Sequence, residues 1–204
     1  MKNKIIAVIG AGGKTTLIHR LAEEYRRKGA SVLVSTTTHM LVEPDTDLSC
    51  DSFAVMEKIK KTGYCMAGSV CPENSAKMQS LPEQMLHDLM KQVDYALIEA
   101  DGAKHYALKY PSEQEPVIPG GTTDVILVLG SWDLGKPCKD VVFRFEHMTS
   151  ALGISGDMKA DKQMLQWIWQ AYEEKLKNMD YQGHFHVLLS EKTDQGLMFH
   201  TLEE

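Results

Sequence analysis

The chain has 204 residues, 43% of them hydrophobic, which is enough for one sizeable core, so we expect a single domain over residues 1–204. A net charge of −6, with acidic and basic residues interspersed, argues against nucleic-acid and membrane partners. Without a membrane-length apolar run or a signal-peptide pattern, we expect a cytoplasmic protein whose four cysteines are reduced rather than bridged or zinc-bound.

The segment with the clearest chemistry starts with an apolar run over residues 5–9, which predicts a buried strand. The loop after it consists of Gly10, Ala11, Gly12 and Gly13. Lys14, Thr15 and Thr16 then open a helix. Backbone amides of such a loop and the positive end of the helix dipole bind phosphate, a lysine reaches the terminal phosphates, and the Thr15 hydroxyl can ligate Mg²⁺. The pattern predicts a nucleoside triphosphate site.

Two alternatives compete with this interpretation of the loop. The eight-residue pattern G-x-x-x-x-G-K-[ST] would need glycine at Val8, so the predicted phosphate loop is a shortened one. The dinucleotide pattern G-x-G-x-x-G would need glycine at Thr15 and an acid at the end of the second strand, where Thr36 stands. A purely structural turn has no need of Lys14, because the helix dipole disfavours a cation there. Phosphate binding is therefore favoured.

The rest of the chain alternates between helical and strand-like patterns. Helices are predicted over residues 14–28, 53–61, 82–90 (with Ser80 as a cap) and 161–177, and strands over residues 31–36, 64–70, 95–100, 124–130 and 184–190. A strand, glycine loop, helix and strand within the first 36 residues form a βαβ unit with a right-handed crossover. We expect an α/β fold: a three-layer, P-loop NTPase-like arrangement with a mostly parallel sheet flanked by helices.

A second chemical segment follows the predicted strand at residues 95–100. An acid at the end of a strand beside a phosphate loop holds Mg²⁺, and a glycine after it lets the backbone approach the γ-phosphate, which fits Asp101 and Gly102. Glu99, on the same strand face by alternation, could orient or deprotonate a nucleophile. Lys104 begins a basic stretch that could meet phosphates or an acidic second substrate. The structural alternatives are a turn acid, a salt-bridged glutamate and a solvated loop.

Two further groups lie where strands are predicted to end. Thr37 and Thr38 could meet the γ-phosphate or an anionic co-substrate, and His39 could transfer a proton; an ST-turn and a loop histidine are the alternatives. Lys192 and Asp194 have the spacing of the N-K-x-D guanine-reading motif, although Glu191 stands in place of its asparagine. An ordinary strand-end loop explains them equally well, so both ATP and GTP stay open.

Three segments together resemble one family, the YqeC family. They are residues 8–17, residues 36–40, and residues 98–104 continuing to 115–119. The resemblance implies a P-loop NTPase-like protein, encoded alongside selenium-dependent molybdenum hydroxylases, that assists their maturation and would have such a hydroxylase or its cofactor as partner. The sequence departs from the family pattern at residues 144–147 and at Glu191.

The leading hypothesis is a Mg²⁺-dependent nucleotide hydrolase or phosphotransferase. In it the loop amides and Lys14 offset charge on the phosphoryl group, Thr15 and Asp101 hold the metal, and Glu99 or His39 handles the nucleophile. The alternative is a non-catalytic accessory protein in which bound nucleotide orders loops for a partner hydroxylase. A dinucleotide-dependent oxidoreductase is a third and weaker hypothesis.

Overall fold

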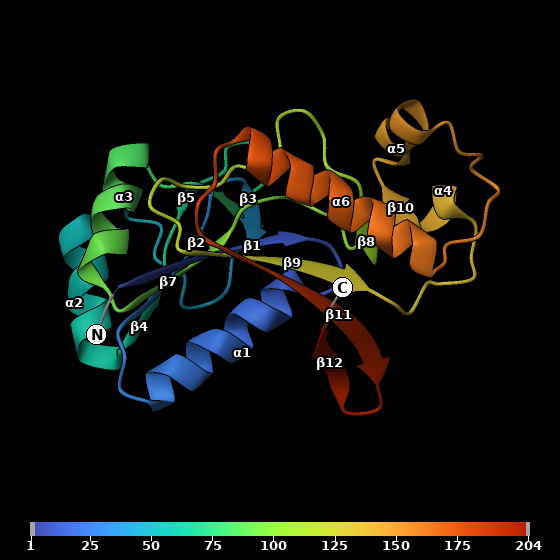
Figure 1. Cartoon of the computed structure of the whole chain (residues 1–204). Coiled ribbons are helices and arrows are strands. Elements are labelled where there is room, and N and C mark those ends of the chain that lie inside the picture. Colours follow the sequence, from blue (N-terminus) through green and yellow to red (C-terminus); the bar gives the residue numbers. More distant parts are fainter. Residues whose placement is uncertain (1–2, 203–204) are drawn as a thin grey trace. The chain divides into compact units, whose positions relative to one another are not determined.

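The computed structural model describes residues 3–202 and contains a large mixed sheet, two small sheets and several helices (Figure 1). Within these residues the large sheet has seven strands in the order β12-β11-β9-β1-β7-β2-β4. In that order the strands span Gly196–Thr201, His184–Thr193, Asp124–Gly130, Lys4–Gly10, Tyr95–Glu99, Val32–Thr36 and Tyr64–Met66. The pairs β1–β7, β7–β2 and β2–β4 are parallel and β11–β12 is antiparallel, which confirms the mainly parallel α/β class.

Two small sheets and six helices complete the described elements. One small sheet pairs β8 (Leu108–Lys109) with β10 (Val142–Phe143), and the other has the order β3-β6-β5, formed by His39–Leu41, Lys77–Gln79 and Ser69–Val70. The helices α1 to α6 span Lys14–Arg27, Ser52–Thr62, Glu83–Gln92, Cys138–Val141, Phe145–Leu152 and Lys162–Asn178. Among the described residues, none of the helices has both the length and the apolar character that crossing a lipid bilayer requires.

The described chain divides into two compact units, each built from several segments. The first comprises residues 3–8, 15–102 and 117–124, and the second comprises residues 9–14, 103–116 and 125–202.

The first unit has helices on both faces of its parallel strands. Its core on one face joins residues of α2 and α3, among them Ile59 and Leu89, to Ile98 of β7. Tyr95 lies three positions earlier on β7, so its side chain points to the opposite face, where it stacks on Tyr25 of α1 at 3.7 Å between ring centroids. Alternation along β7 therefore separates α1 from the α2–α3 pair, which gives three layers within this unit.

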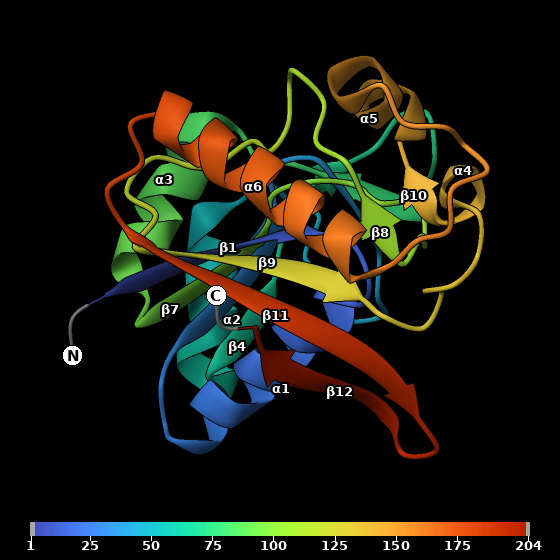
Figure 2. The ribbon, with the colours of Figure 1, turned by 45° about the vertical axis from the view of Figure 1, so that its right-hand side comes forward.

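The second unit is organised around β9, β11 and the long helix α6. In Figures 1 and 2, α6 runs along one face of β9 and β11, and its buried residues follow a helical stripe that includes Ile168 and Tyr172. Asp161 caps α6 by accepting a hydrogen bond from the backbone N–H of Met164 at 3.0 Å. β11 also pairs with β12 in an antiparallel hairpin.

Most predicted elements are confirmed, but the short elements β3, β6, β8, β10, α4 and α5 were not predicted, and three further details differ. The single strand predicted over residues 64–70 is two strands, β4 and β5, which belong to different sheets. The strand predicted to end at Ser190 continues to Thr193 and turns into β12, which was not predicted. The predicted cap at Ser80 is wrong: Pro82 occupies the N-cap position of α3, and the Ser80 hydroxyl donates to the carbonyl of Leu81 instead.

Candidate functional site

The predicted phosphate loop links the carboxyl end of β1 directly to α1. Gly10, Gly12 and Gly13 have φ values of 87°, 87° and 107°, in the left-handed region that only glycine adopts readily. A Cβ at Gly10 would lie 2.4 Å from the carbonyl oxygen of Val128, and one at Gly12 would lie 2.4 Å from the amide nitrogen of Gly130. Two of the three glycines are thus required by the closeness of the β9 backbone as well as by the turn.

Two hydrogen bonds within the second unit hold the loop in this shape. The Ala11 amide donates to the carbonyl of Val128 at 2.9 Å, and the hydroxyl of Ser190, on β11, donates to the carbonyl of Gly12. A Cβ at Gly13 would come within 2.5 Å of the Leu197 side chain on β12. The loop is therefore packed between β9 and the β11–β12 hairpin, and its backbone is fixed before any ligand binds.

Lys14 is the first residue of α1, and its side chain turns back over the loop. Its Nζ donates to the carbonyl of Gly10 at 2.8 Å, and the residue is only 5% exposed. A lysine at a helix start is disfavoured by the helix dipole and is less hydrated when buried, so this conformation concentrates positive charge at the glycine loop. Such an ammonium is suited to bind an anion.

Thr15, the second residue of α1, contacts the acidic end of β7. The register of the parallel pair β1–β7 places Val8 opposite Glu99, so Glu99 lies on the strand next to the one that leads into the loop. The Thr15 hydroxyl donates to Glu99 Oε2 at 3.0 Å, and Glu99 is 7% exposed. The structure thus brings two of the predicted site residues into direct contact. The metal pair predicted from the sequence was Thr15 with Asp101; the carboxylate in contact with Thr15 is that of Glu99. Thr16 follows in the first turn of α1 and is half-buried.

Asp101 and Gly102 lie beyond the end of β7, because the strand stops at Glu99. Asp101 is fully buried. A Cβ at Gly102 would meet no atom within 4 Å, so packing does not explain that glycine. Lys104 has a φ of 44° and belongs to the second unit, where its Nζ lies 5.4 Å from the centre of the Phe143 ring.

The threonines after β2 bind the backbone around Glu99. The Thr36 hydroxyl donates to the carbonyl of Glu99 at 2.8 Å and accepts from the amide of Thr38 at 3.0 Å, which is the ST-turn alternative considered from the sequence. The Thr37 amide also donates to the Glu99 carbonyl at 3.1 Å, and the Thr37 hydroxyl donates to the carbonyl of Val117. These contacts fix the end of β7.

His39 and the C-terminal pair lie on other elements. His39 begins β3 and lies beside Cys71 and Glu73, two residues that the sequence analysis had not linked to it. Lys192 is an exposed residue of β11, and Asp194 is an exposed residue of the turn between β11 and β12. The Nζ of Lys192 lies 4.6 Å from the centre of the Trp132 ring, a cation–π contact.

Sequence reasoning also missed a buried ionic cluster in the second unit. Lys109 is fully buried, and its Nζ lies 2.6 Å from Oε2 of Glu115, which also contacts the Arg144 guanidinium at 3.1 Å. Lys109 and Arg144 both lie within 6 Å of the Phe143 ring centre. The sequence analysis noted the basic stretch that begins at Lys104, but not the pairing of Lys109 and Arg144 with Glu115.

Comparison with known proteins identifies the family. A family profile described as YqeC protein matches residues 6–146. A protein of Escherichia coli K12 described as uncharacterized protein YqeC is 34% identical over 161 residues, covering 75% of this chain and 62% of that protein, so the chain spans less than two thirds of the relative's length. No solved structure matches the chain. The resemblance seen in the glycine loop and the Glu99 segment is confirmed, and the chain belongs to the YqeC family.

Proposed function

We propose that this chain binds a Mg²⁺-nucleoside triphosphate at the loop of residues 10–13 and hydrolyses it or transfers its terminal phosphoryl group. The observation that carries the proposal is the contact of Glu99 with Thr15, a residue that comes just after the loop and Lys14 in the chain. A helix-start hydroxyl bonded to a buried carboxylate at the end of the neighbouring parallel strand is the arrangement by which P-loop enzymes hold Mg²⁺.

The spacing of these two groups fits an octahedral cation. Mg²⁺ binds oxygen at about 2.0–2.1 Å, so two adjacent ligands of an octahedral shell are about 2.9 Å apart. The Thr15 hydroxyl and Glu99 Oε2 are 3.0 Å apart. Both groups are hard oxygen donors of the kind that Mg²⁺ prefers. We therefore assign Thr15 and Glu99 as the pair that would hold the ion, which would supply charge neutralisation at the phosphates.

The remaining residues have roles that follow from their positions. Loop amides and the Lys14 ammonium are preorganised to stabilise charge on the terminal phosphoryl group. Asp101, buried just after β7, is our candidate to orient the attacking group, and Gly102 leaves room there for the ligand. Because the Thr36 hydroxyl and the Thr37 amide both bind the Glu99 carbonyl, their role is to hold the Glu99 segment in place.

Two finer points belong to the same proposal. Lys192 and Asp194 remain candidates for reading the base, so the choice between ATP and GTP is left to the assay. The accessory role in the maturation of selenium-dependent molybdenum hydroxylases rests on the resemblance within the YqeC family, and with it the expectation that such a hydroxylase or its cofactor is the partner.

Fluorescent ATP and GTP analogues, titrated with and without Mg²⁺, test the binding step, and phosphate release tests turnover. We expect Lys14→Ala to weaken binding of the preferred nucleotide at least about tenfold, because it removes a buried charge next to the phosphates. Glu99→Gln should abolish the enhancement by Mg²⁺ while leaving metal-free binding. Lys28→Ala removes an exposed lysine just after the end of α1, the helix that Lys14 begins, and is the matched control.

The outcomes separate the hypotheses. Mg²⁺-dependent binding with turnover supports an enzyme, and tight binding without turnover supports a nucleotide-gated accessory protein. Equal affinity of Lys14→Ala and the wild type would overturn nucleotide binding at this loop.

A further inference from the structure

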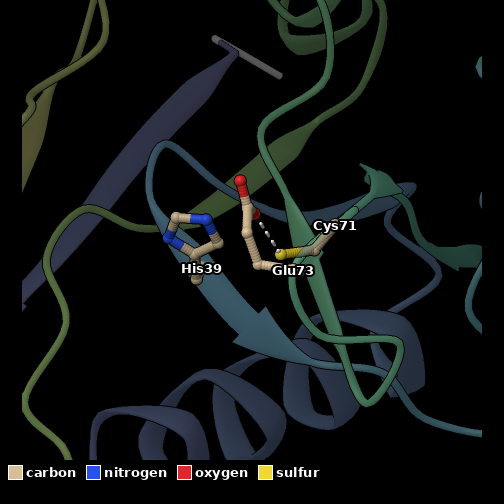
Figure 3. A group of neighbouring side chains, drawn as sticks. All are labelled: His39, Cys71 and Glu73. Carbon is tan, nitrogen blue, oxygen red and sulfur yellow. Dashed lines mark hydrogen bonds between the residues drawn. The ribbon is translucent and has the colours of Figure 1, made fainter.

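We propose that His39, Cys71 and Glu73 form a zinc site with three protein ligands. The imidazole, thiol and carboxylate ligand atoms all lie within 4.8 Å of one another (Figure 3). This inference goes beyond the proposed function and does not depend on it.

The three-stranded sheet β3-β6-β5 brings the ligands together from separate parts of the chain. Gln79 of β6 pairs with His39 on one side and with Ser69 on the other, so β3 and β5 flank β6. Cys71 follows β5, and the amide of Asn74 donates to the Cys71 carbonyl at 3.3 Å, which closes a tight turn containing Glu73. The turn and the strand pairing therefore set the positions of all three residues without a metal.

The distance between the sulfur and the carboxylate oxygen suits a tetrahedral ion. Zinc binds sulfur at about 2.3 Å and carboxylate oxygen at about 2.1 Å, so sulfur and oxygen ligands in a tetrahedral shell are about 3.6 Å apart. The Cys71 Sγ donates a hydrogen bond to Glu73 Oε2 at 3.4 Å, drawn as the dashed line in Figure 3. A cation between the two atoms would replace the thiol proton, which would be released to solvent. The His39 ring nitrogen lies within 4.8 Å of both other ligand atoms and would move toward the ion to complete the set.

The donor set selects the metal. A thiolate and an imidazole favour zinc over Mg²⁺ or Ca²⁺, which prefer oxygen ligands only. Cys71 is 3% exposed, whereas His39 and Glu73 are exposed, so the ion would lie at the surface with the sulfur beneath it. Three protein ligands leave a fourth position for water or a small ligand, as in catalytic rather than structural zinc sites.

Cobalt binding tests the site, because Co²⁺ occupies zinc sites and a thiolate ligand gives it a near-ultraviolet charge-transfer band. The full-length protein, stripped with a chelator and titrated with Co²⁺, should develop this band at one equivalent and lose it when zinc is added. Cys71→Ser should abolish the band. Loss of a residue that only supports a metal ligand lowers metal affinity by about 10- to 100-fold. Loss of a ligand itself should cost at least as much, so His39→Asn and Glu73→Gln should each lower Co²⁺ affinity at least about tenfold.

Cys50→Ser is the matched control, because Cys50 is an exposed thiol outside the trio and its loss should leave the band unchanged. Lys14→Ala should also bind Co²⁺ normally, so failure of the nucleotide proposal would not affect this one. His39 and Glu73 are exposed, and their variants are expected to stay folded by circular dichroism. Absence of the band in the wild type, its persistence in Cys71→Ser, or wild-type affinity in both surface variants would overturn the site.

Discussion

Replacing Gly12 by alanine tests whether the loop between β1 and α1 is held by close backbone packing. The Cβ of alanine would lie 2.4 Å from the Gly130 amide nitrogen, 2.6 Å from its Cα and 2.8 Å from the Ala107 carbonyl oxygen. All three are backbone atoms, so no side-chain rotation relieves the overlap. The φ of 87° adds a penalty of its own for any residue with a Cβ.

Two effects contribute to the expected loss in the free energy of unfolding, and a second glycine-to-alanine variant separates them. A left-handed conformation destabilises a non-glycine residue by about 1–2 kcal/mol, and overpacking adds about 1–3 kcal/mol. Gly12→Ala should therefore lower the free energy of unfolding by about 2–5 kcal/mol. Gly29 has a φ of 81° with nothing within 4 Å of an added Cβ, so Gly29→Ala should show only the first effect.

Urea unfolding followed by circular dichroism measures both variants, and the difference between them isolates the overlap with β9. The same preparations should differ in nucleotide affinity, which Gly12→Ala is expected to lose and Gly29→Ala to keep. Equal destabilisation by the two variants would refute the packing argument, because it would mean that only backbone conformation matters at Gly12.

Two predictions concern polar groups elsewhere. Glu115→Gln removes the negative charge 2.6 Å from the buried ammonium of Lys109 and should lower the free energy of unfolding by about 3–5 kcal/mol. Glu57→Gln, at an exposed ion pair, should change that free energy by less than about 1 kcal/mol. Urea unfolding compares the two variants, and similar values would contradict the argument from burial. Hydrogen bonds from the amide and hydroxyl of Ser31 hold the pKa of Asp94 below its usual value. The ionised Asp94 therefore stabilises the folded protein above the unfolded-state pKa of about 3.9, and this stabilisation is lost as the pH falls through the folded-state pKa. Asp94→Asn should lower stability by about 1 kcal/mol at neutral pH and flatten the acid side of the stability curve, and an unchanged acid side would count against it.

The elements that could be predicted from the sequence are those whose signals are local. The apolar run before the glycine loop and the helical pattern after it specify β1 and α1, and the apolar stretch at residues 124–130 coincides with β9. Asp161, a favoured N-cap residue, marks the start of α6. In each case the deciding residues are neighbours in the chain.

The elements that were missed depend on packing between distant segments. The predicted strand over residues 64–70 breaks near Gly68, where a Cβ would lie 2.6 Å from the Sδ of Met78 on β6. Nothing within that segment indicates the approach of β6. The hairpin partner β12 was missed because residues 191–194 were interpreted as a ligand-reading loop, although a turn before Gly196 and an alternating strand after it form an ordinary hairpin.

In the candidate site, too, the features with a local sequence pattern were predicted and those that depend on distant segments were not. Lys14 and the glycines were predicted because the phosphate-loop pattern is contiguous. The contact between Glu99 and Thr15 was not predictable, since Glu99 and Asp101 both stand near the end of an apolar strand at suitable spacing. It depends on the strand register, which places Glu99 opposite Val8 and within reach of Thr15. The grouping of His39 with residues more than thirty positions later likewise depends on a sheet that sequence patterns did not indicate.

The hydroxyl-rich segment after β2 is where local and distant effects meet. Three successive threonines suggested a row of ligand-facing hydroxyls, yet the Thr36 hydroxyl and the Thr37 amide both bind the carbonyl of Glu99. Two donors on one carbonyl restrict rotation of the peptide after Glu99 and so hold the end of β7 in register beside β1. The Glu99 carboxylate can then meet Thr15 without ordering a mobile chain end, which is the preorganisation that charge stabilisation at a phosphate requires. The threonines thus contribute to the proposed site by fixing the strand that carries its acid.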